Sequence, residues 1–282
     1  MWAVVALYLF QIPDPAGTAQ FEPLYREELA RAERQYGATH PKAAQGLRDL
    51  ALFLRAHSRP EETRELLKRV VSIDPKPEDL LALAELSPPQ EAGPLLERSL
   101  TLKETPEAHH RLADLLAGAR QLEPAEKHYE RAIALYQSAN RPEAGVALND
   151  LGFLYENTER FKQAEPLYRR ALAVHQRVRG PKHPEVATTL NNLGSTLGAQ
   201  GRFAEAEPLI RQALAMFEQT LTPVHERIAA CAANLADMLV ATNRPAAAKP
   251  LYDRAAKIYD QLGRQQDAAD VRQRAAAAAV QR

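Results

Sequence analysis

An internal repeat constrains this chain more than any other feature. Residues 142–183 read PEAGVALNDLGFLYENTERFKQAEPLYRRALAVHQRVRGPKH, and residues 184–225 read PEVATTLNNLGSTLGAQGRFAEAEPLIRQALAMFEQTLTPVH. The stretch from Glu226 repeats the pattern a third time in weaker form. A repeat of this length predicts an array of one small structural unit, with function on the surface that the array forms.

Each unit has the pattern of a helix hairpin. In the unit that starts at Pro142, Leu148, Leu151 and Tyr155 recur at i, i+3 and i+7, which places them on one helix face. Small residues, Gly152 in the first helix and Ala164 in the second, stand where the two helices must come close. The other predicted packing positions are Leu167, Tyr168 and Ala171, then Leu190, Leu193, Gly194, Leu197, Ala206, Leu209, Ile210 and Ala213, then Ala232, Leu235, Ala236, Leu239, Ala248, Leu251, Tyr252 and Ala255.

Proline marks the starts of many predicted helices, because the first turn leaves its N–H groups unpaired in any case. Earlier in the chain this predicts helices over 41–57, 60–73, 77–86, 90–103, 106–119 and 124–138. A half unit from Phe21 precedes them, and a solitary helix over 265–281 is expected to cover the apolar end of the stack. Pro166, Pro208 and Pro250 fall near the starts of second helices, where each removes only an early hydrogen bond.

The predicted organisation has three parts: an N-terminal segment over 1–19, the repeat array over 20–262 and the capping helix over 263–282. The apolar run Trp2–Ile12 is too short to span a bilayer. Followed by the small residues 16–19, it resembles a cleavable secretory signal, which would make the protein secreted or periplasmic without stable membrane insertion. No Lys or Arg precedes the run, so either the true start lies upstream, or the run is an apolar helix packed on the first repeat. Without a signal peptide the protein is expected to be cytoplasmic. A bacterial lipoprotein signal would end at a cysteine, and none is near.

Composition and motifs argue against several functional classes. Lys plus Arg and Asp plus Glu number 36 each and are interspersed, so the overall charge gives no reason to expect nucleic acid as a partner. The sequence has no His-Glu-x-x-His, phosphate-binding Gly loop or Gly-x-Ser-x-Gly motif. We therefore predict no catalytic, cofactor-binding or metal-binding residues and no small-molecule substrate. Cys231, the single cysteine, is expected to be a small buried residue.

The histidines fit structural roles better than chemical ones. His40, His183 and His225 recur at the same junction between units. His109 and His110 are adjacent, so their rings point about 100° apart on a helix and cannot easily bind one metal together.

The Leu-Gly-x-x-Tyr pattern from Leu151 and the Ala-x-x-x-Tyr-x-x-Ala pattern from Ala164 resemble the tetratricopeptide repeat. The 42-residue period and the junction HPEVATTLNNLG from His183 resemble its kinesin light chain subclass. This resemblance implies an all-α, right-handed solenoid of about six helix pairs with a leading half unit and a C-terminal capping helix. It also implies that first helices line a concave face where extended peptides or partner helices bind. No transport role is carried over, since no motor-associated coiled coil is visible.

The resemblance selects candidate partner-binding residues on the first helices: Arg48, Arg55, Asn149, Phe153, Asn191, Asn192, Ser195, Asn234 and Asp237, with His110 and Asp114 in the same register. An Asn amide can both donate to and accept from a bound peptide backbone. The alternative is that these amides fill the space between neighbouring helices and bond within the array.

Arg48 and Arg55 have two possible roles. They could meet an acidic side chain or a terminal carboxylate of a partner. The alternative is that they are solvated surface charges. The accompanying Lys positions of the chaperone-binding subfamily are missing, which argues against a preference for acidic chain termini.

The sequence thus predicts a non-catalytic scaffold that binds a protein or peptide. A structural self-association module and an accessory domain of a larger assembly are the alternatives.

Overall fold

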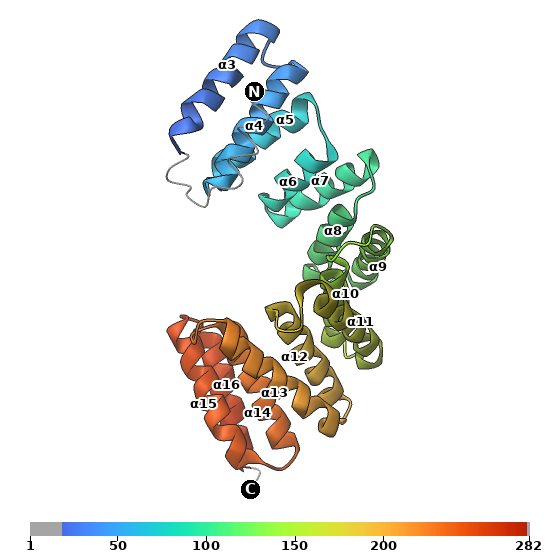
Figure 1. The fold of residues 1–282 in the computed structure, drawn as a ribbon, viewed down its shortest axis with the longest axis vertical. Coiled ribbons are helices and arrows are strands. Elements are labelled where there is room, and N and C mark those ends of the chain that lie inside the picture. Colours follow the sequence, from blue (N-terminus) through green and yellow to red (C-terminus); the bar gives the residue numbers. More distant parts are fainter. Residues whose placement is uncertain (1–18, 281–282) are drawn as a thin grey trace. The chain divides into compact units, whose positions relative to one another are not determined.

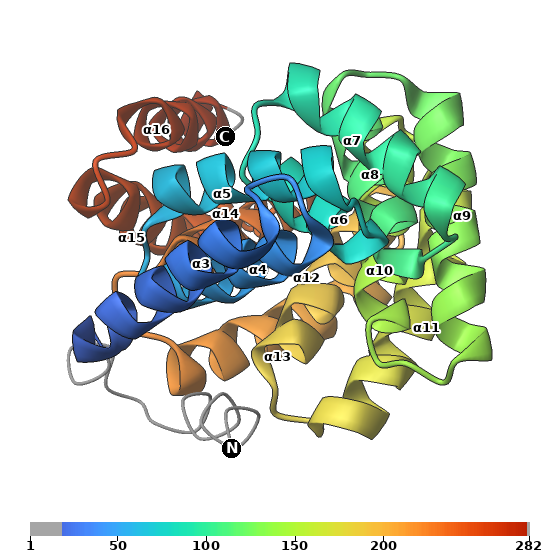
Figure 2. The same ribbon diagram turned by 90° about the horizontal axis from the view of Figure 1, so that it is seen from above.

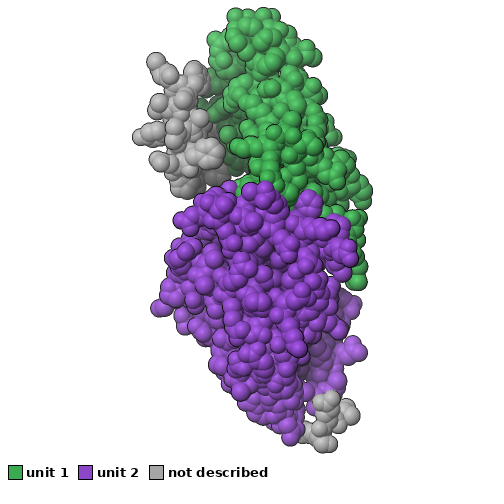
Figure 3. Space-filling view, turned by 90° about the vertical axis from the view of Figure 1, so that its right-hand side faces the viewer, with its two compact units in different colours: residues 1–121 green, residues 122–282 purple. Residues whose placement is uncertain are grey.

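The computed structural model describes residues 19–280, and every regular element in that range is helical (Figure 1). The chain divides into two units, residues 1–121 and 122–282, which Figure 3 distinguishes by colour. The all-α array of helix hairpins predicted from the sequence is confirmed. The predicted signal segment, residues 1–19, lies outside the described residues except for Ala19.

Unit 1 begins with a short 3-10 turn, η1 (Ala19–Phe21). Its helices are α3 (Glu22–Tyr36), α4 (Pro41–Ala56), α5 (Pro60–Ile73), α6 (Pro77–Glu85), α7 (Pro89–Leu102) and α8 (Pro106–Gly118). The pairs α4/α5 and α6/α7 form hairpins, α3 packs against α4, and α8 packs against α7. Leu47, Leu50 and Leu54 of α4 are buried in the first hydrophobic cluster, against Leu29 of α3 and Val70 of α5.

Unit 2 contains longer helices. They are α9 (Leu122–Ser138), α10 (Ala144–Asn157), α11 (Phe161–Arg179), α12 (Pro184–Ala199), α13 (Phe203–Thr220), α14 (Glu226–Ala241), α15 (Pro245–Gln261) and α16 (Gln265–Val280). The pairs α10/α11, α12/α13 and α14/α15 are the three hairpins of the long repeats. Each hairpin also packs on the next, through α11 against α12 and α13 against α14.

The predicted packing positions form the core of unit 2. Almost all of them are buried, including Leu148, Tyr168 and Ile210, which are inaccessible to solvent. Leu209 and Leu251 differ, because each is partly exposed at its position on the second helix. A Cβ at Gly152 would lie 2.8 Å from the Tyr168 ring and one at Gly194 would lie 2.4 Å from Ile210, so both positions need the small residue that the sequence has there.

Proline and histidine together define several helix starts. The side chains of His40, His183 and His225 accept hydrogen bonds through Nδ1 from backbone N–H groups two residues later, at 3.1–3.2 Å. These junction histidines are therefore N-caps, which satisfy one of the unpaired donors of the first turn.

Some predicted helix starts shift by two residues. The helix expected from Pro124 begins at Leu122, and the helix expected from Pro142 begins at Ala144 after a turn. Pro94, Pro166, Pro208 and Pro250 each stand sixth in a second helix. The helices continue through them, because a proline there removes only one early hydrogen bond.

The final helix, α16, packs beside α15, as Figures 1 and 2 show from two directions. Ala268, Val271 and Ala278 are its buried residues, and most of its other described side chains are exposed. We propose, as the sequence suggested, that this helix closes the stack. Within residues 19–280, no helix is both long enough and apolar enough to cross a membrane.

Candidate partner-binding surface

A hydrogen-bonded row of amides runs across the first helices of unit 2. Asn234 on α14 donates through Nδ2 to Oδ1 of Asn191 on α12, at 3.1 Å. Asn191 donates to its neighbour Asn192 at 3.3 Å, and Asn192 donates to Asn149 on α10 at 3.2 Å. Asn149 in turn donates to the carboxylate of Asp150 at 3.5 Å. We call Asn149, Asn191, Asn192 and Asn234 the amide ladder.

The hydrogen bonds of the ladder all run in one direction, from donor to acceptor along the chain Asn234, Asn191, Asn192, Asn149 and Asp150. All four side chains are only half-buried. Each amide carries two donor hydrogens and two acceptor lone pairs, and the ladder uses one donor of each. At least one N–H of every amide is therefore left for another acceptor, on a surface that the ladder itself holds in place.

The structure thus shows that the four amides bond within the array, the alternative left open by the sequence. Their remaining donors keep partner binding chemically possible. Asn192 and Asn234 are equivalent residues of successive units, and each donates to an asparagine of the preceding unit. The bond from Asn191 to Asn192 joins these two contacts into one continuous ladder.

Phe153, Ser195 and Asp237 occupy the same position in successive units and have different surroundings. Phe153 on α10 is 52% exposed, the most exposed of the large apolar side chains in the described part of the chain. Ser195 Oγ on α12 is buried, and no described residue gives it a hydrogen-bond partner. Asp237 on α14 accepts from Tyr252 Oη and pairs with Arg274, both at 2.5 Å. Burial raises the pKa of Asp237 above its usual value, although these two partners favour the charged form.

Glu156 lies on the same side of α10 as Asn149 and Phe153, since the three are spaced i, i+4 and i+7. Its carboxylate accepts a hydrogen bond from Tyr168 Oη of α11 at 2.7 Å, which links this side of α10 to the core of the hairpin. Burial raises the pKa of Glu156, and the hydrogen bond from Tyr168 opposes this rise.

In unit 1 the two candidate arginines of α4 have carboxylate partners. Arg48 is partly buried and donates to Asp79 at 2.8 Å and to Asp74 at 3.0 Å, so it connects α4 to the start of α6. Arg55 is half-exposed and pairs with Glu85 at 2.7 Å. No spacing in the sequence signals these pairs, because the partners lie 26–31 residues away.

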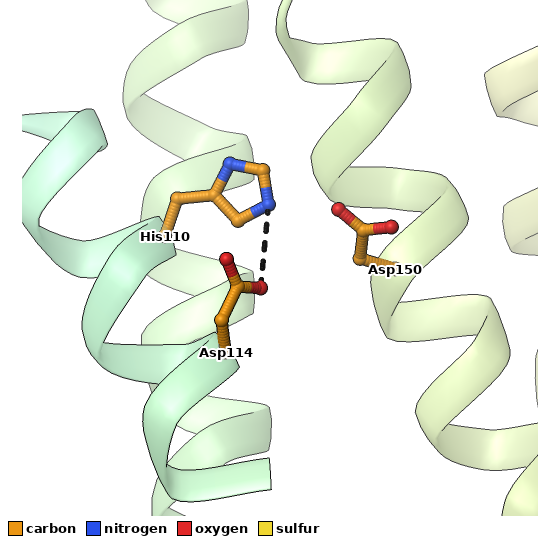
Figure 4. A group of neighbouring side chains, drawn as sticks. All are labelled: His110, Asp114 and Asp150. Atoms are coloured by element: carbon orange, nitrogen blue, oxygen red, sulfur yellow. Dashed lines mark ion pairs between the residues drawn. The ribbon is translucent and has the colours of Figure 1, made fainter. Parts of the chain in front are cut away.

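His110 and Asp114 lie one turn apart on α8, where Nε2 of the imidazole and a carboxylate oxygen are 3.8 Å apart (Figure 4). The adjacent His109 faces Glu104 at 3.2 Å. The two neighbouring histidines therefore have different carboxylate partners.

One recurring contact between second helices was not predicted. The residue before α5, α11, α13 and α15 is an arginine, and it pairs with a glutamate near the start of the preceding second helix, or of α3 in the first case. The pairs are Arg59–Glu22, Arg160–Glu126, Arg202–Glu165 and Arg244–Glu207. Three of the four span 37 residues, and in those three the glutamate directly precedes a proline. That Glu-Pro sequence, followed at a fixed distance by Arg, was the available signal.

Comparisons with known proteins agree with this architecture. The family model for the tetratricopeptide repeat matches residues 143–219 and 195–261. No curated protein matches the chain.

Several solved structures share the fold. The crystal structure of BtubC (BKLC) from P. vanneervenii has a TM-score of 0.59 and 21% identity, covering 85% of this chain and 92% of that one. PilF of Pseudomonas aeruginosa has a TM-score of 0.60 and 16% identity, covering 81% and 98%. The Cut9-Hcn1 structure of the APC/C has a TM-score of 0.64 and 15% identity, covering 90% of this chain and 46% of that one.

At these identities the solved structures show the fold alone. The tetratricopeptide fold generally serves as a scaffold for protein interaction and is typically non-catalytic. The matched repeats, the hairpins observed in both units and the shared fold agree with one another. The chain therefore carries tetratricopeptide repeats over residues 143–261 and has the fold of a tetratricopeptide repeat solenoid.

Proposed function

We propose that this chain is a non-catalytic scaffold that binds a protein or peptide partner on the face formed by α10, α12 and α14. The observation that carries the proposal is the amide ladder. It places four polar side chains of one kind in a row across three successive units, half-buried and held by one another. The general role of the family as an interaction scaffold supports the same class of activity.

The chemistry of the ladder suits a peptide backbone. A backbone offers an alternating series of N–H donors and C=O acceptors, and amide side chains can match both. The ladder fixes the rotamers of its members before a partner arrives, which lowers the entropy lost on binding. Exposed Phe153, one turn beyond Asn149 on α10, adds an apolar contact to this polar surface.

The other candidate residues fit this proposal in different ways. Asp237 and Arg48 already bond to described side chains, so we assign them the support of the surface rather than direct contact. Arg55 has an exposed guanidinium and remains a candidate contact in unit 1. Ser195 lies one turn beyond Asn191 on α12, but its hydroxyl is buried, so we do not assign it a direct contact with a bound peptide.

Affinity capture with mass spectrometry from the native organism tests the proposal. Three baits are compared: the natural chain, the Asn191→Ala plus Asn234→Ala variant, and a control with Gln212→Ala plus Gln219→Ala. The control removes two exposed amides from the second helix α13. We expect proteins enriched by the natural chain to be enriched by the control and lost from the ladder variant.

Equal enrichment by all three baits would reject the ladder as the binding surface. Sedimentation at several protein concentrations separates a monomeric receptor from a self-associating module, because only the latter changes its mass with concentration. A parallel bait without residues 1–19 reports whether that segment alters the set of captured partners.

A further inference from the structure

A groove runs between the second helices α9 and α11, and residues of α10 also line it (Figure 1 labels the three helices). It consists of two adjoining hollows of about 480 and 420 Å³, both lined by Gln137. The first hollow has an apolar floor that includes Ile133, Leu151 and Leu167. The groove lies within unit 2 and shares no residue with the amide ladder.

The rim of the groove carries more positive than negative charge. Lys162 and Arg170 line the first hollow, and Arg141 and Arg177 line the second, against a single lining carboxylate, Glu130. Arg141 already pairs with Glu143 at 2.9 Å. In the described part of the chain, no carboxylate lies within ion-pair distance of the other three cations.

A comparison along the array shows what is missing from this groove. Arg254 on α15 occupies the position equivalent to Arg170, two repeats later, and it pairs with Glu218 of the preceding second helix α13. Arg170 instead donates to the amide of Gln137 on α9, at 3.5 Å. A neutral amide therefore stands where a carboxylate balances the later arginine, and the charge of Arg170 is left for an outside group.

The shape of the groove favours a helical occupant. Lys162, Pro166, Arg170 and Arg177 follow one side of α11 over 16 residues, or about 22 Å from first to last at the rise of an α-helix. An extended peptide would leave backbone N–H and C=O groups unpaired above an apolar floor, whereas a helix pairs its own. A helix with apolar residues on one side and carboxylates along the edges matches both the floor and the rim.

We propose that the α9/α11 groove is a second docking surface, which binds an acidic amphipathic helix of a partner protein. Its apolar side chains enter the two hollows, and its carboxylates pair with Lys162, Arg170 and Arg177. The proposal does not depend on the ladder as a binding site.

A synthetic helix tests the groove directly. The probe is a fluorescein-labelled peptide of about 15 residues with Leu at i, i+3, i+4 and i+7 and Glu elsewhere. A second peptide carries Lys in place of Glu. Binding to the full chain is followed by fluorescence anisotropy. We expect the acidic peptide to saturate with a dissociation constant below about 100 μM and the basic peptide to bind at least about tenfold more weakly.

Charge-reversal variants identify the surface. Arg170→Glu plus Arg177→Glu is expected to weaken the acidic peptide about tenfold or more. The control, Arg227→Glu plus Lys257→Glu, makes the same change in net charge at exposed positions outside the groove and should bind within about twofold of the natural chain. Arg170→Lys plus Arg177→Lys keeps the charge and should retain binding. Circular dichroism melting shows that each variant is folded.

Several outcomes would overturn the proposal. They are no saturable binding of the acidic peptide up to about 1 mM, equal loss in both charge-reversal variants, or self-association of the chain that the groove variant abolishes. The Asn191→Ala plus Asn234→Ala variant should bind the acidic peptide normally, so failure of the groove and failure of the ladder are distinguishable.

Discussion

Two glycines on α12 determine how closely its neighbours pack. A Cβ at Gly194 would lie 2.4 Å from Ile210 Cγ1 and 3.2 Å from the backbone oxygen of Ala206. A Cβ at Gly198 would lie 2.5 Å from Met238 Cε, the flexible end of a long side chain. The first site is enclosed by a branched side chain and backbone, and the second has a neighbour that can move.

We therefore expect Gly194→Ala to lower the free energy of unfolding by about 1–3 kcal/mol, the usual effect of overpacking a core. Gly198→Ala, on the same helix, should lower it less, because Met238 can change rotamer and alanine favours the helix. Urea unfolding of the two variants measures both values. A larger loss for Gly198→Ala would contradict the packing described for α12.

His175 on α11 is a buried imidazole with a pH-dependent effect on stability. It is 3% exposed, and its Nδ1 lies 3.3 Å from a carboxylate oxygen of Glu185. Burial lowers the pKa of His175; Glu185 favours the charged ring, while Arg179 and His183 oppose it. Below about pH 6.5 the unfolded chain therefore binds a proton here that the folded chain does not.

The free energy of unfolding should therefore decrease as the pH is lowered from about 6.5 to the lowered folded-state pKa of His175. His175→Gln removes this dependence, so its stability should change less than that of the natural chain between about pH 7.5 and pH 5.5. The raised pKa values of Glu156 and Asp237 act with the opposite sign, but both groups are present in both proteins. If stability changes equally with pH in the natural chain and in the His175→Gln variant, folding does not lower the pKa of His175.

Residue roles were only partly predictable from the sequence. The repeat spacing placed the asparagines on the first helices, because helix periodicity fixes a face. It did not show which amide bonds to which, since that depends on the contact between α10, α12 and α14. Arg48 shows the same limit, because its partners Asp74 and Asp79 follow α5 and are brought to α4 only by folding.

At the scale of elements, the arginine–glutamate pairs connect consecutive second helices. Glu165 near the start of α11 is 8% exposed and accepts from Arg202, which precedes α13, at 2.7 Å, and from Gln200 at 3.0 Å. Burial tends to raise the pKa of Glu165, but hydrogen bonds from Arg202, Gln200 and Arg169 outweigh it and lower the pKa. The ionised form is therefore stabilised by folding.

We expect Glu165→Ala to lower the free energy of unfolding by about 1.5–3 kcal/mol near neutral pH, as for hydrogen bonds to a charged group. The difference should shrink in acid, because a carboxyl with a lowered folded-state pKa loses its contribution as the pH falls from the unfolded value of 4.5 through the folded value. Asp253→Ala, which removes an ion pair exposed on both sides, serves as the control and should change stability much less. Equal effects of the two substitutions would show that the recurring pair is not a stabilising contact between units.

The helices themselves were predictable because the residues that mark their starts act locally. Proline at the first position begins α4, α5, α6, α8 and α12, and its fixed φ suits that position wherever the rest of the chain lies. The partial exposure of Leu209 and Leu251 was not predicted. The helical period shows which way a side chain points, but not how far the neighbouring helix covers that side chain.

The whole molecule is a repeat array in which the three long units carry the tetratricopeptide pattern most clearly, since the matched residues 143–261 all lie in unit 2. The division after Gln121 was not predicted. Residues 119–121 resemble the other short connections of the chain, and their sequence carries no break in composition.

We propose that the amide ladder binds a partner while also bonding within the array. The most direct test is a titration of the captured partner against the natural chain and the Asn191→Ala plus Asn234→Ala variant, with melting temperatures of the same samples. We expect affinity to fall about tenfold or more, while the melting temperature falls by only a few degrees, as the loss of about 1 kcal/mol from half-buried hydrogen bonds implies. Unchanged affinity together with a large fall in melting temperature would show that the ladder contributes to packing and does not bind the partner.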